Sequence, residues 1–207
     1  MSTPTQHRPH RLLLHACCGP CLLEPLDALV AEADEVVIAF ANPNIHPADE
    51  YERRRDTLIG YAAEVGVDVV ELPYAPQVWE AAVAPLADAG AERCRACYRL
   101  RLGLAAQMAA DGGFDALATT LSVSPYQDQA AINAEGRRAA AAAGVQWLDR
   151  DFRERYRDAT TRSRELGMYR QNYCGCVFSQ SEASAERQAR KDARAAEKAA
   201  RKPPSQD

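Results

Sequence analysis

The chain has 207 residues, 47% of them hydrophobic, and a formal net charge of −4. This length is enough to bury one full core, so we expect a single soluble domain. No apolar run reaches the roughly 18 residues of a membrane span, and the charge balance gives no overall signature of nucleic-acid binding. The chain has seven cysteines, an odd number that leaves no complete pairing. In a reducing compartment, such cysteine clusters are typical of metal or redox chemistry and not of a disulfide scaffold.

The two ends of the chain differ in composition from its middle. Residues 1–10 are polar and lack the apolar segment of a secretory signal, so we expect a flexible N-terminus on a cytoplasmic protein without membrane contact. Residues 11–181 form the predicted domain. Residues 182–207 form an Ala/Arg/Lys-rich tail, in which residues 187–202 carry seven Lys/Arg against two acids. This pattern predicts a solvated basic helix with a frayed end.

Short apolar segments predict five β-strands, which cover residues 12–14, 36–41, 67–72, 116–123 and 145–148. Helical patterns cover residues 22–33, 49–65, 94–112 and 129–143, whereas residues 73–93 are less regular and residues 151–180 are polar and mostly helical. Alternating strands and helices are typical of βαβ units. We therefore predict a doubly wound α/β domain with a mainly parallel, Rossmann-like sheet of the PP-loop/HUP kind, flanked by helices.

Two cysteine groups lie at positions that favour metal binding. Cys17 and Cys18 follow the first predicted strand, and Cys94 and Cys97 lie near the first turn of a predicted helix. Ligands of doubly wound folds bind beyond the carboxyl ends of the strands, and a helix N-terminus favours thiolate over thiol. Four thiolates hold either tetrahedral zinc or a [4Fe–4S] cluster, and the spacing leaves both open. Three interpretations of Cys21 are open: a cysteine of the hydrophobic core, a spare metal ligand, or a thiol beside the metal centre.

Cys174 and Cys176 form a third group, with one glycine between them. A disulfide between such close cysteines closes a very small ring that is strained and readily reduced. The pair therefore suits electron transfer better than structural stabilisation. A further metal-binding pair or two inert thiols are equally compatible with the composition.

Five sequence motifs follow one another between residues 11 and 180. They are residues 12–21 (LLLHACCGPC), 42–47 (NPNIHP), 92–101 (ERCRACYRLR), 119–126 (TTLSVSPY) and 169–176 (YRQNYCGC). Together they closely resemble the QueH family of epoxyqueuosine reductases. The tail beyond residue 181 lies outside the resemblance.

The resemblance implies an activity and a metal centre. The activity is the two-electron reductive removal of the epoxide oxygen of epoxyqueuosine at the tRNA wobble position, which gives queuosine and water. The implied ligands of a [4Fe–4S] cluster are Cys17, Cys18, Cys94 and Cys97. Iron is then favoured over zinc, because zinc has no redox chemistry. An additional iron beside the cluster is left open.

The resemblance also implies that Cys174 and Cys176 form a redox-active disulfide. The partners are then a tRNA that carries epoxyqueuosine in its anticodon loop and an electron donor that the sequence does not identify. We hypothesise that the cysteine pair relays two reducing equivalents, while the cluster passes one electron at a time and binds the epoxide oxygen as a Lewis acid. The reverse assignment of these two roles is also open.

Three residues near the ends of predicted strands are candidate proton donors for the departing oxygen: His15, Asp128 and Asp151. Each has a structural alternative. His15 could brace the cysteine loop, and each aspartate could cap a helix.

Aromatic and basic residues of the motifs are candidates for contact with the anticodon loop. Tyr98, Tyr126 and Tyr173 offer aromatic faces for an unstacked base, although core packing is as compatible with each of them. A run of arginines could meet anticodon phosphates or form a solvated helix face. This run consists of Arg93, Arg95, Arg99 and Arg101.

Two other functions are open alternatives. A PP-loop-like tRNA sulfur-transfer enzyme shares the α/β layout, but it needs a Gly/Ser-rich ATP loop after the first strand, where this chain has residues 17–21 (CCGPC). A zinc-stabilised RNA-binding module predicts a colourless protein with bound zinc and no redox titration.

Overall fold

A computed structural model describes residues 8–200 of the chain and the side chains of residues 8–197. Residues 1–7 of the predicted flexible N-terminus and residues 201–207 of the predicted tail lie outside this range. Where the described part begins, Arg8 and His10 both contact the carboxylate of Asp34. These surface contacts hold residues 8–10 against the body of the domain.

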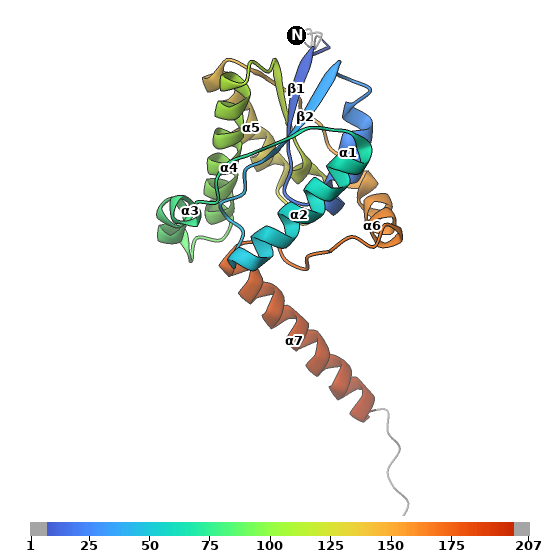
Figure 1. Cartoon of the computed structure of the whole chain (residues 1–207). Helices are drawn as coiled ribbons and strands as arrows, with labels where there is room; N and C mark the ends of the chain where they lie inside the picture. Colours follow the sequence, from blue (N-terminus) through green and yellow to red (C-terminus); the bar gives the residue numbers. More distant parts are fainter. Residues whose placement is uncertain (1–7, 201–207) are drawn as a thin grey trace, which may run out of the picture.

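The centre of the fold is a parallel β-sheet (Figure 1). Within residues 8–200 its strands follow the order β3-β2-β1-β4-β5, and every neighbouring pair is parallel. The strands are β1 (Arg11–His15), β2 (Glu35–Phe40), β3 (Val69–Glu71), β4 (Ala116–Thr119) and β5 (Gln146–Trp147). The chain winds outward from β1 to β3 and then returns to the other side of β1. This topology confirms the predicted α/β fold class with a parallel sheet.

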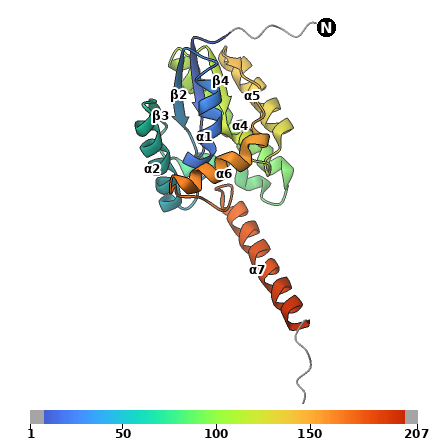
Figure 2. The same ribbon diagram turned by 90° about the vertical axis from the view of Figure 1, so that its right-hand side faces the viewer.

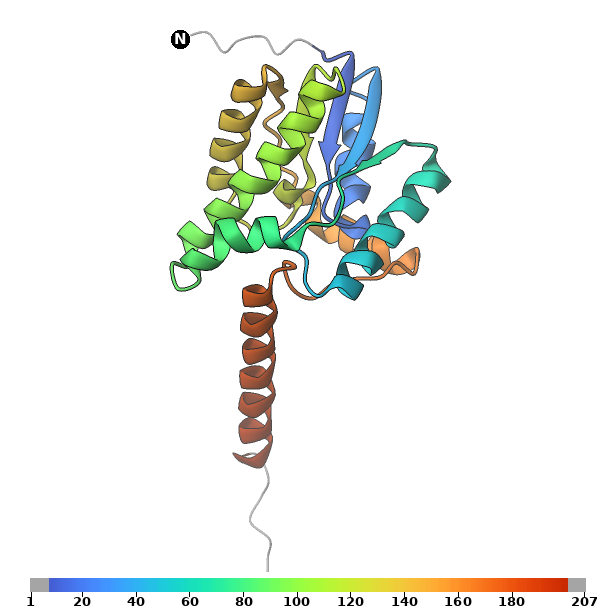
Figure 3. The ribbon, with the colours of Figure 1, turned by 60° about the vertical axis from the view of Figure 1, so that its left-hand side comes forward.

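Helices cover both faces of the sheet (Figures 1 and 2). One face packs against α1 (Gly19–Leu29) and α2 (Ala48–Val65), and α6 (Tyr156–Glu165) packs on α1. The other face packs against α4 (Ala91–Asp111) and α5 (Gln129–Ala143). The shorter α3 (Pro76–Val83) and the 3₁₀ turn η1 (Ala84–Leu86) lie against α4. The last helix, α7 (Val177–Ala200), extends away from the body (Figure 3).

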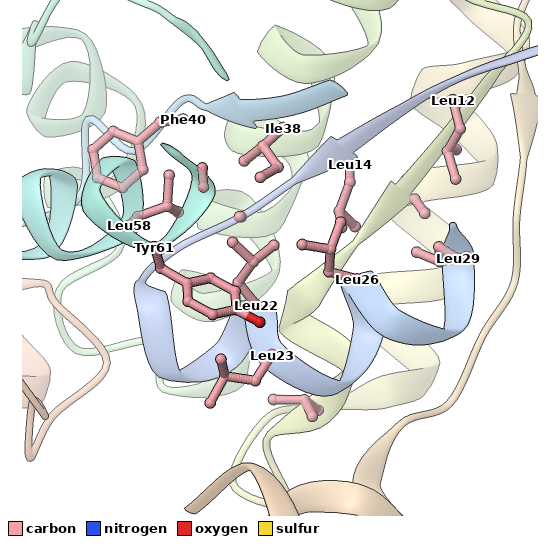
Figure 4. Packing of buried hydrophobic residues seen from close by; sticks show 14 of the residues in the cluster. Leu12, Leu14, Leu22, Leu23, Leu26, Leu29, Ile38, Phe40, Leu58 and Tyr61 are labelled. Carbon is pink, nitrogen blue, oxygen red and sulfur yellow. The ribbon is translucent and has the colours of Figure 1, made fainter. Parts of the chain in front are cut away.

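The two hydrophobic layers follow from the alternation of side chains along the central strand. Leu12 and Leu14 face the layer of α1 and α2, and Leu13 faces the layer of α4 and α5. Figure 4 shows how leucines of α1, including Leu22 and Leu26, pack against the first of these faces. Each fully buried leucine stabilises the fold by about 1.5–3 kcal/mol. The apolar run of β1 is therefore the part of the sequence that holds both layers together.

The predicted strand 116–123 is wrong beyond Thr119. Residues Thr120–Val123 form a buried 3₁₀ helix, η2. The hydroxyl of Thr119 accepts a hydrogen bond from the backbone N–H of Leu121, which caps this turn. Because that N–H is used locally, it does not extend the ladder of the sheet. The predicted strand 145–148 is likewise shorter and is limited to Gln146–Trp147.

The helices of the structure also differ from the prediction in three regions. Helix α1 begins at Gly19, so Cys21 lies on its first turn and not in the preceding loop. Residues 73–93 contain α3, whose buried Trp79 and Val83 recur at helical spacing. In residues 151–180 the turn η3 (Arg153–Arg155) and α6 are helical, but a loop covers residues 166–176.

The predicted boundary between residues 181 and 182 lies inside α7. The helix begins directly after Cys176, and Phe178 on its first turn packs near Trp79 with ring centroids 5.9 Å apart. Most residues further along α7 are exposed up to residue 197. Throughout residues 8–200, no helix combines the length and the apolar character that crossing a bilayer requires.

Gly136 of α5 provides a test of the packing between α5 and β5. A Cβ atom added to Gly136 would lie 2.4 Å from the indole ring of Trp147. We expect Gly136→Ala to lower the free energy of unfolding by about 1–3 kcal/mol, because overpacking against a rigid ring outweighs the gain in helix propensity. The matched control is Gly60→Ala in α2, where nothing lies within 4 Å. It should raise stability by about 0.5–1 kcal/mol. Equal denaturant midpoints for the two variants would contradict this packing.

Candidate metal and thiol site

The cysteine loop lies at the carboxyl edge of the sheet, where the winding reverses between β1 and β4. Cys17 follows β1, and its backbone N–H donates to the hydroxyl of Thr120, the first residue after β4, at 3.4 Å. Asn42 follows β2 at the same edge and donates to the carbonyl oxygen of Ala16 at 2.8 Å. Doubly wound folds bind their ligands at this position, because the loops after oppositely directed connections leave a crevice there.

Three sulfur atoms meet in this loop. The Sγ atoms of Cys17, Cys18 and Cys21, which we call the N-terminal trio, all lie within 4.8 Å of one another. The start of α1 produces this arrangement: Cys18 is extended, and the helix that begins at Gly19 turns Cys21 back toward the loop. A Cβ atom on Gly19 would lie 2.9 Å from the methyl group of Thr57. The close approach of α1 to α2 therefore favours glycine.

The thiols of the N-terminal trio differ in acidity. Hydrogen bonds with Cys18 and Cys21 lower the pKa of Cys17, and the guanidinium of Arg101 lowers it further. Burial raises the pKa of Cys18 to about 12, and hydrogen bonds with Cys17 and Cys18 raise the pKa of Cys21. The trio therefore combines one thiol that is more acidic than usual with two thiols that would lose their protons on binding a metal.

A second group of sulfur atoms lies at the start of α4. Cys97 is buried in an apolar cluster with Trp79 and Val83, and Cys176 packs against this cluster. Cys94, one turn earlier, is exposed. Burial raises the pKa of both Cys97 and Cys94. The structure thus brings Cys97 and Cys176 together from segments that are distant in the sequence.

The predicted four-cysteine set spans both groups of sulfur atoms. Among the described residues, the N-terminal trio has its three sulfur atoms within 4.8 Å of one another, and Cys94 and Cys97 are not part of it. Cys21, which the sequence leaves unassigned, is part of it. Every cysteine of the chain is a free thiol in this structure, including Cys174 and Cys176. The cluster ligands and the redox-active pair stay predictions.

A buried arginine of α2 holds the Cys-Gly-Cys segment. Arg54 pairs with Glu50 at 2.7 Å, and the two side chains are 1% and 6% exposed. Its remaining nitrogen atoms donate to the carbonyl oxygens of Cys174 at 2.9 Å and Tyr173 at 3.2 Å. Gly175 has a φ of 133°, and a Cβ atom there would lie 3.1 Å from the guanidinium. Both the backbone conformation and the close approach of Arg54 require glycine at this position.

Two side-chain amides reach sulfur atoms of different groups. Gln171 donates to Sγ of Cys18 at 2.8 Å, and Gln127 donates to Sγ of Cys174 at 3.5 Å. Gln127 in turn accepts a hydrogen bond from the hydroxyl of Tyr98 at 2.7 Å. Through Gln171, the loop that carries the Cys-Gly-Cys segment also contacts the N-terminal trio. Hydrogen bonds to sulfur stabilise negative charge on it and tune the potential of a bound metal centre.

A second buried arginine, Arg101 of α4, lies near both groups of sulfur atoms. Its Nη2 donates to Oδ1 of Asn42 at 2.6 Å. Its Nε and Nη1 atoms have no hydrogen-bond partner within the part of the chain that the structure describes. Burial alone lowers the pKa of Arg101, but the sulfur atoms of Cys97 and Cys17 more than offset this and leave the pKa raised.

These residues fit a thiolate-bound metal centre. Thiolates are the preferred donors of zinc and of iron–sulfur clusters, and the N-terminal trio supplies three sulfur atoms at one place. A buried guanidinium with unsatisfied N–H groups is costly unless an anion compensates it. Metal-bound thiolates beside Arg101 would provide that negative charge.

The predicted proton donors each have a structural partner. His15 is fully buried, with Nδ1 2.8 Å from the hydroxyl of Thr119. Burial lowers the pKa of His15 to about 3, so its ring is neutral at pH 7. Asp128 caps α5 by accepting a backbone N–H of its first turn. Asp151 pairs with Arg153, whose hydrogen bond lowers the pKa of the carboxyl group. Proton donation by these residues stays a prediction.

The three candidate aromatic residues differ in exposure. Tyr126 is 83% exposed, and its ring makes an edge contact with Tyr156 at 6.0 Å. Tyr98 is buried. The hydroxyl of Tyr173 donates to the carbonyl oxygen of His46 at 2.6 Å. Tyr126 is therefore the candidate whose ring face is accessible for stacking.

The candidate arginines of α4 separate into surface and interior residues. Arg93 pairs with Glu182 of α7 at 2.6 Å. Arg95 and Arg99 both pair with Glu135 of α5, and each is 52% exposed. The last residue of the run, Arg101, is 1% exposed and therefore does not lie on the surface.

A parallel α/β fold with sulfur atoms gathered at its switch point defines a thiol-based metal or redox protein. Comparison with known proteins gives the family: a sequence model described as "Epoxyqueuosine reductase QueH" matches residues 12–182. The chain belongs to the epoxyqueuosine reductase QueH family, which confirms the resemblance seen in the five motifs.

Relatives named epoxyqueuosine reductase QueH match most of the chain. The protein of Streptococcus pyogenes serotype M1 is 36% identical over 177 residues, which cover 81% of this chain and 69% of that protein. The Thermotoga maritima protein is 35% identical over 175 residues, with 81% of this chain and 89% of that protein covered. The Dehalococcoides mccartyi protein is 33% identical over 173 residues, with coverages of 83% and 93%.

Sequence reasoning missed Gln171 and Arg54, which help to build the site, and it considered Arg101 only as a phosphate contact or a solvated residue. Arg101 follows Cys97 by four positions, a spacing that places both on one face of a helix, and this signal was available. Gln171 lies inside one of the recognised motifs. Arg54 gives only the local signal of its i,i+4 pairing with Glu50, which is common on exposed helices, because its partner carbonyl in Cys174 is 120 residues away.

Arg54→Met should test whether α2 holds the Cys-Gly-Cys segment. We expect the free energy of unfolding to fall by about 3–5 kcal/mol, because the buried Glu50 would lose its cationic partner. Amide hydrogen exchange of residues 169–176 should also accelerate. The control, Arg55→Met, changes a surface residue of the same helix that is 34% exposed, and it should change stability by less than about 0.5 kcal/mol. Equal exchange rates in the two variants would rule out the anchoring role.

Proposed function

We propose that this protein is a tRNA-modifying oxidoreductase that removes the epoxide oxygen of epoxyqueuosine, the activity for which its relatives are named. The main support is that three distant segments with cysteines, residues 17–21, 94–97 and 174–176, lie together at the carboxyl edge of a parallel sheet. Buried arginines and hydrogen bonds connect these segments. The reaction consumes two electrons and two protons and converts the epoxide into an alkene and water. The substrate is then a tRNA with epoxyqueuosine in its anticodon loop.

The proposed metal centre is a [4Fe–4S] cluster held by Cys17, Cys18, Cys94 and Cys97. The lowered pKa of Cys17 and the Sγ atom of Cys18, 3.8 Å from that of Cys17, support this assignment. When bound, such a cluster supplies single electrons and an iron that acts as a Lewis acid. Cys21 lies within 4.8 Å of the first two sulfur atoms. It is therefore the first candidate for an exchanged ligand or for a ligand of an additional iron.

Cys174 and Cys176 store the two reducing equivalents in this proposal. Oxidation of two thiols to one disulfide releases two electrons and two protons, which are the numbers that the epoxide consumes. Burial, with a further contribution from Cys97, raises the pKa of Cys174 to about 12, so this thiol carries its proton at neutral pH. An external electron donor must reduce the disulfide after each turnover.

The departing oxygen needs a proton, for which His15, Asp128 and Asp151 are the proposed donors beside the thiols. His15 lies two residues before Cys17, and its Nε2 has no hydrogen-bond partner among residues 8–200. The carboxylates of Asp128 and Asp151 are used in a helix cap and an ion pair. His15 is therefore the first candidate, and it would act as a neutral imidazole that passes a proton on.

Two features support contact with the anticodon arm. Tyr126 presents an exposed ring shortly after β4, where an unstacked base can stack on it. The basic run of α7, which begins at Arg187, extends from the body and can track phosphates. Arg95 and Arg99 of α4 are two additional exposed cations, although both form ion pairs with Glu135.

Cys174→Ser tests the division of labour among the cysteines. Anaerobically purified protein should be brown and contain about four irons and four sulfides per chain. The variant should keep this iron and its absorbance but lose multiple turnover of epoxyqueuosine tRNA, because one thiol cannot close a disulfide. The measurements are iron, zinc and sulfide analysis together with nucleoside analysis of the treated tRNA.

Cys97→Ser is the matched control, since it should lose iron as well as activity. Stoichiometric zinc in the wild-type protein would favour a zinc-stabilised RNA-binding module instead. Retained multiple turnover by the Cys174 variant would refute the relay.

Truncation after residue 186 tests the basic helix. We expect tRNA affinity to fall about tenfold at low salt and its salt dependence to flatten, because fewer counterions are released on binding. A full-length variant with glutamine at positions 187, 190 and 194 should reproduce this effect without shortening the helix. The measurement is a series of binding titrations between low and moderate salt. An unchanged salt slope in both variants would exclude the tail from tRNA binding.

A further inference from the structure

Arg101 is a buried charge for which the proposed reaction gives no role. It lies on α4, four residues after Cys97, and is 1% exposed. Its Nη2 donates to Oδ1 of Asn42 at 2.6 Å, and the amide of Asn42 donates to the carbonyl oxygen of Ala16 at 2.8 Å. Ala16 directly precedes Cys17. The guanidinium is therefore tied to the cysteine loop on one side and to the helix of the second cysteine pair on the other.

The partner of Arg101 is a neutral amide, in contrast to the partner of the other buried arginine. Arg54 pairs with the carboxylate of Glu50 at 2.7 Å. Arg101 forms no ion pair with a carboxylate anywhere in the described range 8–200, and two of its nitrogen atoms have no partner there. Asn42 accepts one N–H without cancelling the charge. The positive charge of Arg101 is therefore positioned but not neutralised.

The groups whose ionised forms raise the pKa of Arg101 are the thiols of Cys97, Cys17 and Cys174 and the phenol of Tyr98. These sulfur atoms come from all three cysteine motifs. A compensating anion is required in the interior, since an unpaired buried charge is strongly unfavourable. The nearby cysteines can supply this anion as thiolates or as the sulfur-bound centre that they would hold.

We propose that Arg101 is a positioning residue that serves as the fixed countercharge of the sulfur-bound centre and raises its reduction potential. The proposal rests on the proposed function, because it assumes that the cysteines hold a redox-active cluster. The step concerned is the uptake of one electron by that cluster from an external one-electron donor, with no bond formed or broken. A nearby cation stabilises the reduced form, which carries one more negative charge than the oxidised form.

Potentiometric titration of the anaerobically reconstituted full chain tests this role. At the wild-type midpoint potential, Arg101→Gln should show a ratio of reduced to oxidised cluster about tenfold lower than wild type, equivalent to about 59 mV for one electron. Arg101→Lys keeps the charge and should restore most of this ratio. Arg99→Gln removes the same charge from the surface of the same helix, where the side chain is 52% exposed. It should leave the potential unchanged, because solvent screens that site.

Asn42→Asp provides a second test in case Arg101→Gln does not fold. It would place a carboxylate against the guanidinium in nearly the same volume, so the potential should again become more negative although Arg101 is retained.

An unchanged potential in both folded variants overturns the proposal, and a raised KM for tRNA at unchanged potential would assign Arg101 to the substrate instead. Wild-type protein that has a cluster but reduces no epoxide would refute the proposed function and not the role of Arg101. Wild-type protein without a cluster would refute both proposals.

Discussion

The site depends on the cost of burying positive charge. Two guanidinium groups lie in the interior beside the cysteines, where water does not compensate them. Arg54 is satisfied by Glu50 and by two carbonyl oxygens of the Cys-Gly-Cys segment, so the chain after α6 must return to α2 and cannot continue outward. Arg101 is satisfied only in part, by Asn42. Charge compensation therefore decides both the path of residues 169–176 and the electrostatic environment of the sulfur atoms.

The parallel sheet makes this arrangement possible because its strands end at one edge. Cys17 after β1, Asn42 after β2 and Thr120 after β4 meet there without long excursions of the chain. The short strands leave little backbone between the apolar core and the loops. Core packing on β1 therefore also fixes the cysteine loop, and Gly19 lets α1 approach α2 closely enough to bring Cys21 beside the first two thiols.

The sequence was sufficient for the fold and for the cysteine motifs, since both depend on local patterns. The apolar run of β1 and the regular spacing of α2 and α5 predicted their elements almost residue by residue. The end of β4 was missed because Thr119 caps a turn through a local hydrogen bond from the N–H of Leu121, and the apolar run that predicted a strand does not show this bond. Burial of Arg101 was also missed. The neighbouring arginines of α4 are the same residue type on the same helix. Only the packing of Asn42 and the cysteines against Arg101 distinguishes it from these neighbours.

Helix α7 begins inside the site, and the predicted domain boundary between residues 181 and 182 lies within this helix. The backbone N–H of Ser179 donates to Sγ of Cys176 at 3.3 Å. Phe178 packs near Trp79, and Arg93 pairs with Glu182 at 2.6 Å. These contacts fix the first turns of the helix on α3 and α4, while most of the helix beyond them is exposed. The direction of the basic run is thus set by packing beside Cys97 and Cys176, so the helix that carries the proposed RNA contact and these two cysteines form one structural unit.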